Sequence, residues 1–294
     1  MTPDHVPILV SYAYWDNVAP HLHKIDPARF DLIIDSGAFT AYSLGKEIKL
    51  DEYMRFLRSI DSTWRWRAIQ LDVMGDEKKT ERNLQTMLDA GFDNILPVFT
   101  RGHNIDRLDY LHSLPSDCVM FGGIVEGKGN LGYVKWFMER NGDRPVHWLG
   151  FGNTSFLQRY RPKSYDSSSF KSGEMYVRPS VYAGKMRHYR LGREHFAKRP
   201  SYKHVQDLQR MGFTMEEIRW LGREKTWTGC KLRTNQTADD PTGLISLITY
   251  VTYCLKALEL KRRCGTDTYW AYVTTPETVF WALDWLRERS VDIY

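Results

Sequence analysis

The stretch LIIDSGAF, residues 32–39, joins three apolar residues to an aspartate and, two positions further on, a glycine. An uninterrupted apolar run of this length is typical of a strand that is covered on both faces, as the strands of parallel sheets are. The glycine indicates that the regular structure ends there. The stretch therefore predicts a buried strand with Asp35 at its carboxyl end.

Similar short apolar runs alternate with segments of helical periodicity over the first 170 residues. One such segment, residues 50–57, has apolar side chains at positions i, i+3, i+4 and i+7, the stripe of a helix that packs on a core. Strands that alternate with helices form repeated βα units and a parallel sheet. We expect strands at Ile8–Tyr12, Leu32–Asp35, Ala68–Asp72, Ile95–Phe99, Cys118–Phe121, Val146–Leu149 and Ser164–Asp166.

These seven strands are one fewer than a (βα)₈ barrel contains. We expect the eighth at Tyr269–Thr274, with a helix at Pro276–Arg289 after it, and Glu174–Arg178 is the competing candidate. With the late strand, a helix at Leu244–Arg263 packs against the outside of the barrel. The sequence thus predicts an α/β fold, a TIM-type (βα)₈ barrel. Its expected parts are the barrel and active site at 1–170, a basic, mainly helical insertion at 171–240, and the C-terminal helices and last strand at 241–294.

Length and composition agree with such a fold. The 294 residues are 42% hydrophobic and 26% charged, which excludes a wholly disordered or collagen-like chain. The longest uncharged apolar stretch, residues 243–255, is shorter than the roughly 18 to 20 residues of a membrane span. The start shows no secretory pattern, and the four cysteines form no Cys-x-x-Cys pair. We therefore expect a cytoplasmic protein with reduced thiols and no membrane partner.

Positive charge is concentrated in one segment. Residues 185–233 carry 13 Lys and Arg against 5 Asp and Glu, whereas the whole chain has a net charge of only +5. Aromatic and histidine residues are interleaved with these cations, a combination that favours a nucleic-acid partner over a solvated basic face, which is the alternative. We expect the nucleic-acid contacts at the start of the segment, from Lys185, Arg187, Arg190 and Arg193.

Within this segment, Val205–Leu221 predicts two short helices. Gly212 suits the position after a helix end, and Thr214 with Glu217 three residues later forms a capping box for the second helix. A helix-turn-helix that enters a DNA groove is one interpretation. A plain αα-hairpin is the alternative, and the short match favours it.

Three aspartates follow predicted strands directly: Asp35, Asp72 and Asp166. Active sites of parallel barrels lie at the carboxyl ends of the strands, so we expect these side chains to meet there, although each alone could be a helix cap. Glycines at neighbouring strand ends, Gly122, Gly123 and Gly150, allow the backbone to approach a planar ligand such as a nucleobase. Phe39 is expected to stack on one face of the base, with Trp148 or Phe151 on the other; core packing is the alternative for each aromatic.

The motifs around these residues resemble the tRNA-guanine transglycosylases, which exchange guanine in a polynucleotide for a 7-deazaguanine base. LIIDSGAFTAYSLG at 32–45 is similar to the DSGGF region of that family. Four further motifs resemble it in the same order: LDVMGD at 71–76, FGGIVEG at 121–127, WLGFGN at 148–153 and YDSSSF at 165–170. The likeness extends over about 130 residues.

The resemblance implies a role for each site residue. Asp166 would attack C1′ of the nucleotide and form a covalent glycosyl-enzyme, and Asp35 would act as general acid and base. Asp72 would accept hydrogen bonds from N1–H and the exocyclic amine of guanine. The remaining contacts to the base would come from Ser36, Phe39, Gly122, Gly123, Ile124 and Gly150.

Departures from the family decide the expected substrate. Ala38 stands where DSGGF has its second glycine, and residues 97–101 lack the family's recognition glutamine. The closely spaced cysteines and histidine of the family's zinc element are missing after Asp166, so we expect neither a structural zinc nor any cofactor. A shorter chain with a basic insertion is similar to the DNA-modifying phage and bacterial relatives. The expected partners are therefore DNA and a free 7-deazaguanine base, in its 7-cyano or 7-aminomethyl form.

Three alternatives share some of these features. A tRNA enzyme would use the same chemistry but read RNA shape and 2′-hydroxyl groups. A non-catalytic DNA-binding protein on a barrel scaffold would not need all three aspartates. A nucleoside or glycoside hydrolase would resolve the covalent intermediate with water instead of a base.

Overall fold

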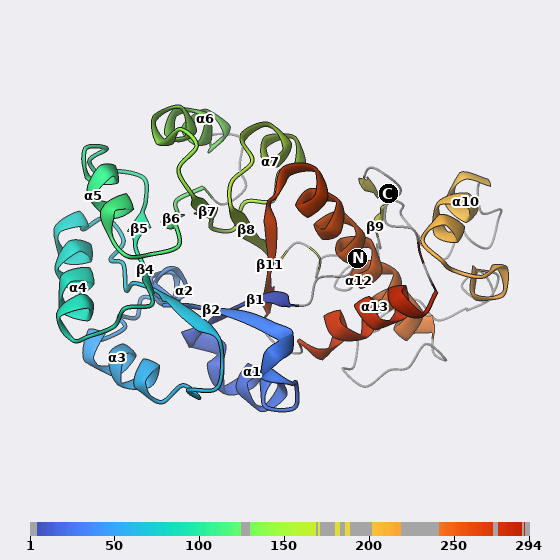
Figure 1. The fold of residues 1–294 in the computed structure, drawn as a ribbon, viewed down its shortest axis with the longest axis horizontal. Helices are drawn as coiled ribbons and strands as arrows, with labels where there is room; N and C mark the ends of the chain where they lie inside the picture. The colour runs from blue at the N-terminus through green and yellow to red at the C-terminus, as the bar shows by residue number, and fades with distance from the viewer. Residues whose placement is uncertain are drawn as a thin grey trace. The chain divides into compact units, whose positions relative to one another are not determined.

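The computed structural model describes residues 5–124, 130–168, 170, 180–182, 186–188, 202–218, 241–272, 276–289 and 291. The chain divides into two compact units (Figure 1). The sheet unit comprises Asp4–Ser167 and Arg263–Thr274. The helical unit comprises Met1–Pro3, Ser168–Arg262 and Thr275–Tyr294. Each unit is described separately.

The sheet unit contains nine parallel strands in the order β4-β3-β2-β1-β11-β8-β7-β6-β5. Their bounds are β1 Val6–Ser11, β2 Phe30–Asp35, β3 Trp66–Ile69, β4 Ile95–Leu96, β5 Val98–Phe99, β6 Val119–Phe121, β7 Val146–Trp148, β8 Ser164–Ser167 and β11 Asp267–Tyr272. The two outermost strands, β4 and β5, are separated in the chain by Pro97 alone. The sheet is therefore a nearly closed, barrel-like α/β structure, which agrees with the predicted fold class at this level.

Pro97 explains why the strand predicted at Ile95–Phe99 is found as two pieces. Proline has no N–H to give to a neighbouring strand, so the ladder is interrupted there. The carbonyl of Pro97 still accepts a hydrogen bond from the N–H of Met120 at 2.8 Å. The next N–H, of Val98, donates to the side-chain Oε1 of Gln70 at 2.9 Å. The side chain of Gln70 thus replaces one backbone partner.

The late strand is confirmed, because β11 lies in the sheet between β1 and β8. Its observed start, Asp267, is two residues earlier than predicted, and residues 273 and 274 of the prediction lie outside the described residues. The competing candidate, Glu174–Arg178, lies outside the described residues. Of the earlier strands, β3 differs most from its prediction: it ends at Ile69, so Asp72 lies in the connection that follows the strand.

Helices follow the strands and lie around the outside of the sheet (Figure 1). They are α1 Trp15–Leu22, α2 Ala38–Ser43, α3 Leu50–Arg58, α4 Glu77–Asp89, α5 Arg107–Ser113, α6 Asn130–Asn141 and α7 Thr154–Tyr160, with short 3₁₀ turns η1 Tyr12–Tyr14 and η2 Pro27–Arg29. Side chains just before two of these helices cap their amino ends. The carboxylate of Asp76 caps α4 by accepting from the N–H of Lys79 at 2.9 Å, and Asn153 caps α7.

The interior of the sheet is layered along the strand direction. An apolar cluster fills the middle; it consists of Leu9, Ile33, Ile69, Leu96, Val98, Cys118, Met120 and Tyr269. At the amino ends of the strands, the Arg67 guanidinium pairs with Asp31 and Asp117. The Tyr269 hydroxyl donates to Asp31 at 2.6 Å and accepts from Arg67 at 2.6 Å. These charged side chains at the amino end of the sheet are therefore paired with one another.

The helical unit contains two long C-terminal helices, α12 Pro241–Cys264 and α13 Glu277–Glu288, as the sequence predicts. The last two residues of α12, Arg263 and Cys264, belong to the sheet unit by the division given above. The expectation that this helix packs on the outside of the barrel stays a prediction. The insertion is not purely helical, because β9 Ser180–Tyr182 and β10 Met186–His188 form an antiparallel pair. Within the described part of the chain, no helix is long and apolar enough to cross a membrane.

The predicted helical hairpin is found at α10 Tyr202–Arg210 and residues 215–218. The capping box is confirmed: Thr214 N–H donates to Glu217 at 2.7 Å, and Glu217 N–H donates to the Thr214 hydroxyl at 3.2 Å. Gly212 has a φ of +94°, and an added Cβ would lie 2.7 Å from Val291. The turn packs on α13 through ring contact between Phe213 and Trp285, whose centroids are 4.7 Å apart.

Candidate active site

The three predicted aspartates meet at the carboxyl ends of the strands of the sheet unit. Asp35 is the last residue of β2, Asp166 lies in β8, and Asp72 follows β3. Asp35 is close enough to both of the others for each pair to repel electrostatically. Neither Asp35 nor Asp72 is the cap of a described helix, since Gly37 precedes α2 and Asp76 caps α4. The position of these two carboxyls at the strand ends therefore needs an explanation other than capping.

Asp35 combines a high pKa with access to solvent. The pKa of its carboxyl is raised to about 6, mainly by burial and also by the charge of Asp166. The Ser11 hydroxyl and the N–H groups of Gly37 and Ser36 oppose this rise. The N–H of Gly37 donates to Asp35 Oδ2 at 3.1 Å, and the side chain remains partly exposed. A carboxyl with these properties can exchange a proton with a ligand near neutral pH.

Asp72 has a still higher pKa. Burial raises it to about 7, and the neighbouring Asp35 contributes in the same direction, whereas the Ser36 hydroxyl lowers it. Ser36 is completely buried, so its hydroxyl stabilises the carboxylate form of Asp72 in the absence of any ligand. Donors from a bound base would take over part of this stabilisation and lower the pKa of Asp72.

Tyr53 lies beneath these two carboxyls and was recognised in the sequence only as part of a helical stripe. It is fully buried, and its hydroxyl donates to the carbonyl of Ile69 at 2.9 Å. Burial raises its pKa well above the usual value, and the charges of Asp35 and Asp72 add to this. Tyr53 therefore stays protonated and holds the end of β3 in place.

Asp166 is anchored through one carboxylate oxygen. Its Oδ1 accepts a hydrogen bond from the N–H of Gly150 at 2.9 Å and lies 3.2 Å from His147 Nε2. Only 8% of Asp166 is exposed. The sequence assigns Gly150 to the base, but its N–H is already used by Asp166. Gly150 has a φ of +66°, the left-handed region that glycine adopts without strain.

His147 is a site residue that sequence reasoning missed. It is completely buried in β7, with Nδ1 2.8 Å from the Ser164 hydroxyl and Nε2 facing Asp166. The available signal was a histidine between apolar neighbours on a strand of a parallel sheet. The order Ser164, His147, Asp166 matches the residue types of a serine hydrolase triad. However, Ser164 is only 3% exposed, so its hydroxyl cannot act as a nucleophile on a ligand.

The two glycines after β6 pack closely against the loop that carries Thr100. A Cβ on Gly123 would lie 2.9 Å from the Thr100 hydroxyl, and one on Gly122 would lie 3.3 Å from the same atom. Gly123 also has a φ of +71°. Ile124 is fully buried, and residues 125–129 lie outside the described part. The expected contact of this backbone with a base stays a prediction.

The aromatic residues divide clearly. Trp148 and Phe151 are fully buried with ring centroids 5.5 Å apart, so core packing, the alternative interpretation, is correct for both. Phe39 in α2 is 62% exposed and follows Asp35 by four residues in the chain. Tyr42 and Leu44 are exposed nearby. Only Phe39 of the three predicted stacking residues is thus accessible to a base.

The expected nucleic-acid contacts fall mostly outside the described residues, which exclude Lys185, Arg190 and Arg193. The backbone of Arg187 pairs with Val181 in the β9–β10 hairpin. These contacts stay predictions. The helical hairpin nearby favours the plain interpretation, because the second helix begins with Glu216 and Glu217, whose charges oppose phosphate.

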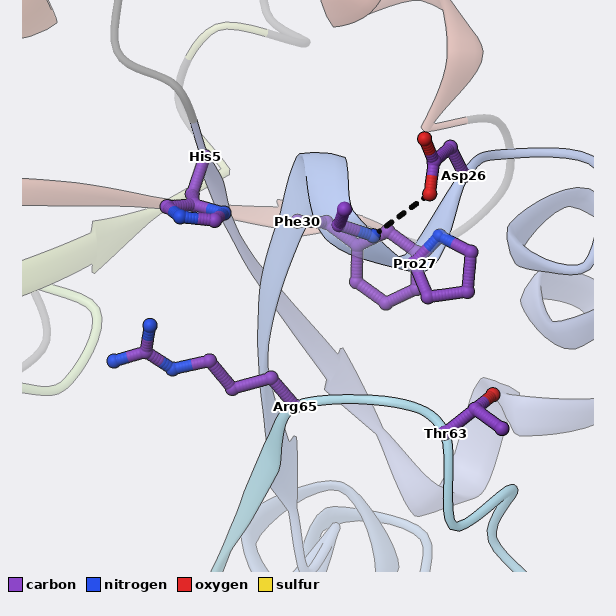
Figure 2. Close-up of a pocket in the computed structure, with 7 residues that line it drawn as sticks. His5, Asp26, Pro27, Phe30, Thr63 and Arg65 are labelled. Carbon is purple, nitrogen blue, oxygen red and sulfur yellow. Dashed lines mark hydrogen bonds between the residues drawn. The ribbon is translucent and has the colours of Figure 1, made fainter.

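A pocket lies at the opposite, amino ends of the strands (Figure 2). It is lined by His5, Asp26, Pro27, Ala28, Phe30, Thr63 and Arg65. Asp26 is held there by the N–H of Ala28 at 2.9 Å, the dashed line in Figure 2. Because Phe30 begins β2 and Asp35 ends it, the pocket and the aspartates are separated by the length of the strand. The pocket is not part of the candidate active site.

Neither a metal site in the described part of the chain nor a match to a curated protein is found. Among the residues that the structure describes, no group of three or more His, Cys, Asp or Glu is placed to hold a metal ion, and the expectation of no metal and no cofactor stays a prediction. In comparisons with known proteins, no protein-family model and no curated protein matches the chain.

Proposed function

We propose that this protein is a DNA-guanine transglycosylase that exchanges guanine in DNA for a 7-deazaguanine base through a covalent intermediate on Asp166. The observation that carries the proposal is the meeting of Asp35, Asp72 and Asp166 at one end of the sheet. We also propose that β4 and β5 act as one strand, so that the sheet is a (βα)₈ barrel. In that fold, the carboxyl ends of the strands are where active sites lie.

In the first half-reaction, a carboxylate oxygen of Asp166 attacks C1′ of the target nucleotide. A C1′–O bond forms as the C1′–N9 bond breaks, and guanine leaves with the bonding electrons. Asp35 in its protonated form gives the leaving guanine a proton. Its pKa of about 6 supports this role, because a useful fraction is protonated near neutral pH.

In the second half-reaction, Asp35 as a carboxylate takes the N9 proton of the incoming base. N9 then attacks C1′ and breaks the bond to Asp166, so both carboxyl groups return to their starting states. This is the double displacement of retaining glycosidases with a base in place of water. Two successive inversions at C1′ retain the configuration of the nucleoside.

Asp72 is suited to recognise the base. As a carboxylate it accepts hydrogen bonds from the N1–H and exocyclic amine that guanine and 7-deazaguanines share. Its partner Ser36 supports the charged form, and exposed Phe39 offers an aromatic face for stacking. The basic segment 185–233 supports a polyanionic substrate, whose target nucleotide must leave the base stack for attack at C1′.

The test measures release of labelled guanine from DNA and, separately, from tRNA, with and without a 7-deazaguanine base. The Asp166→Ala variant serves as the blank. Base-dependent release from DNA alone is the expected result. Release from tRNA alone would replace DNA by tRNA as substrate, release without added base would identify a hydrolase, and no release from either would contradict the enzymatic function.

A further inference from the structure

The buried pair Ser164 and His147 has no role in the reaction described above. It forms a chain of polar contacts that ends on Asp166: Ser164 Oγ lies 2.8 Å from His147 Nδ1, and His147 Nε2 lies 3.2 Å from Asp166 Oδ1. We propose that Ser164 and His147 are positioning residues that hold Oδ1 of Asp166, so that Oδ2 is the oxygen that attacks C1′. This inference rests on the proposed function.

The assignment of the attacking oxygen follows from where the hydrogen bonds fall. The N–H of Gly150 and Nε2 of His147 both contact Oδ1. Among the described residues, no donor contacts Oδ2. A carboxylate oxygen that accepts two hydrogen bonds is held in place and is a weaker nucleophile, because its electron density is shared with the donors. The other oxygen keeps its lone pairs for C1′.

The proposed role of Asp166 fixes the form of the imidazole. A carboxylate that attacks C1′ can only accept hydrogen bonds, so Nε2 carries a hydrogen and donates it to Asp166. Nδ1 is then the acceptor, and the Ser164 hydroxyl donates to it. His147 is completely buried and Ser164 nearly so, so water cannot readily take the place of either partner. Ser164 therefore selects the tautomer that Asp166 needs.

Neighbouring side chains limit movement of the ring. Tyr269 lies edge-on to His147, with ring centroids 5.4 Å apart. Residues Tyr269 and Asp166 are also register partners in the ladder between β11 and β8. Packing and hydrogen bonds together restrict the imidazole to one orientation, as a positioning group requires.

The first experiment compares His147→Phe, His147→Gln and wild type in steady-state base exchange. We expect His147→Phe to lower kcat about 100-fold with little change in KM for DNA, because the nucleophile is present but misoriented. His147→Gln keeps an N–H donor and should recover most of kcat. The control is Thr266→Val, which removes a buried hydrogen bond to Pro162 at the amino end of β11. A wild-type kcat in His147→Phe, or no recovery with Gln, would overturn the proposal.

The second experiment does not require turnover. Nitrogen-15 chemical shifts of the His147 ring report which nitrogen carries the proton, in wild type and in Ser164→Ala. We expect Nε2–H in wild type and a mixture of tautomers in Ser164→Ala. A proton on Nδ1 in wild type would overturn the positioning role even if base exchange is observed. Absence of base exchange with Nε2–H present would instead count against the proposed function.

Discussion

The two ends of strand β2 carry the same residue type in opposite electrostatic settings. Asp31, near the amino end, pairs with Arg67 and accepts a hydrogen bond from Tyr269. Asp35, at the carboxyl end, faces two further carboxyls, and no cation pairs with it among the described residues. A paired buried charge holds a fold together, whereas crowded carboxyls cost stability and are typical of functional sites. Four predictions test this contrast.

The largest effect is expected at Asp166. Asp166→Asn keeps the shape of the side chain but removes the nucleophile, so base exchange should fall at least about 10³-fold. Binding of DNA should change little, because the carboxylate acts in the covalent step. Gel-shift titration alongside the exchange assay measures both quantities. The loss of binding and exchange together would contradict the role of nucleophile.

The next effect is expected at the amino end of the sheet. Arg67→Met leaves the partly buried Asp31 with only the longer contact to Arg65 at 3.5 Å and should lower the free energy of unfolding by about 2 kcal/mol. Exchange per folded molecule should remain near wild type. Denaturant titration and activity at low temperature measure the two effects. The exposed pair of Arg55 and Asp51 provides the control, since Arg55→Met should cost less than about 0.5 kcal/mol. Similar losses of unfolding free energy in the two variants would show that the Asp31–Arg67 pair stabilises the fold no more than an exposed ion pair does.

At Asp72, substitution is expected to increase the free energy of unfolding instead of lowering it. Its pKa of about 7 lies above the ordinary value of 3.8, so the folded state binds more protons than the unfolded state between these values. Stability must therefore fall as pH rises through this interval, and at lower pH the penalty disappears. Asp72→Asn should remove the Asp72 contribution to this fall, leaving the smaller one from Asp35, and raise the free energy of unfolding at about pH 8 by about 2 kcal/mol, while base exchange is lost.

Thermal unfolding near pH 4 and near pH 8 measures this difference. The exposed Asp143→Asn serves as its control, with no expected change in the pH dependence. A variant at Asp72 that is less stable than wild type at the higher pH would show that the carboxylate has a favourable partner.

The smallest effect is expected at Phe39. Stacking of a base on an aromatic ring is worth about 1 to 3 kcal/mol, so Phe39→Ala should weaken binding of the free 7-deazaguanine base about 5- to 150-fold. The melting temperature should not change, because the side chain is 62% exposed. Calorimetric titration with the base measures the affinity. Tyr110→Ala, at another exposed aromatic, is the control, and equal affinities in the two variants would remove Phe39 from the site.

The sequence alone determined the features that depend on neighbours in the chain. Apolar runs predicted the strands, including the late β11, because burial on both faces of a parallel sheet requires them. The capping box of Thr214 and Glu217 was predicted correctly, since its hydrogen bonds join residues only three positions apart. The three aspartates could be selected because each follows a strand.

Only the tertiary structure decided how those aspartates differ. The pKa of Asp35 depends on burial and on Asp166, and that of Asp72 on burial and on Asp35, so both values arise from segments far apart in the chain. The hydrogen bond of His147 to Asp166 spans 19 residues, and that of Tyr53 to Ile69 spans 16. No local pattern encodes such contacts, because which side chains meet at the end of a sheet is fixed only when parallel strands pair. The sequence therefore shows which residue types are available to the site, and the folded arrangement determines their pKa values and hydrogen-bond partners.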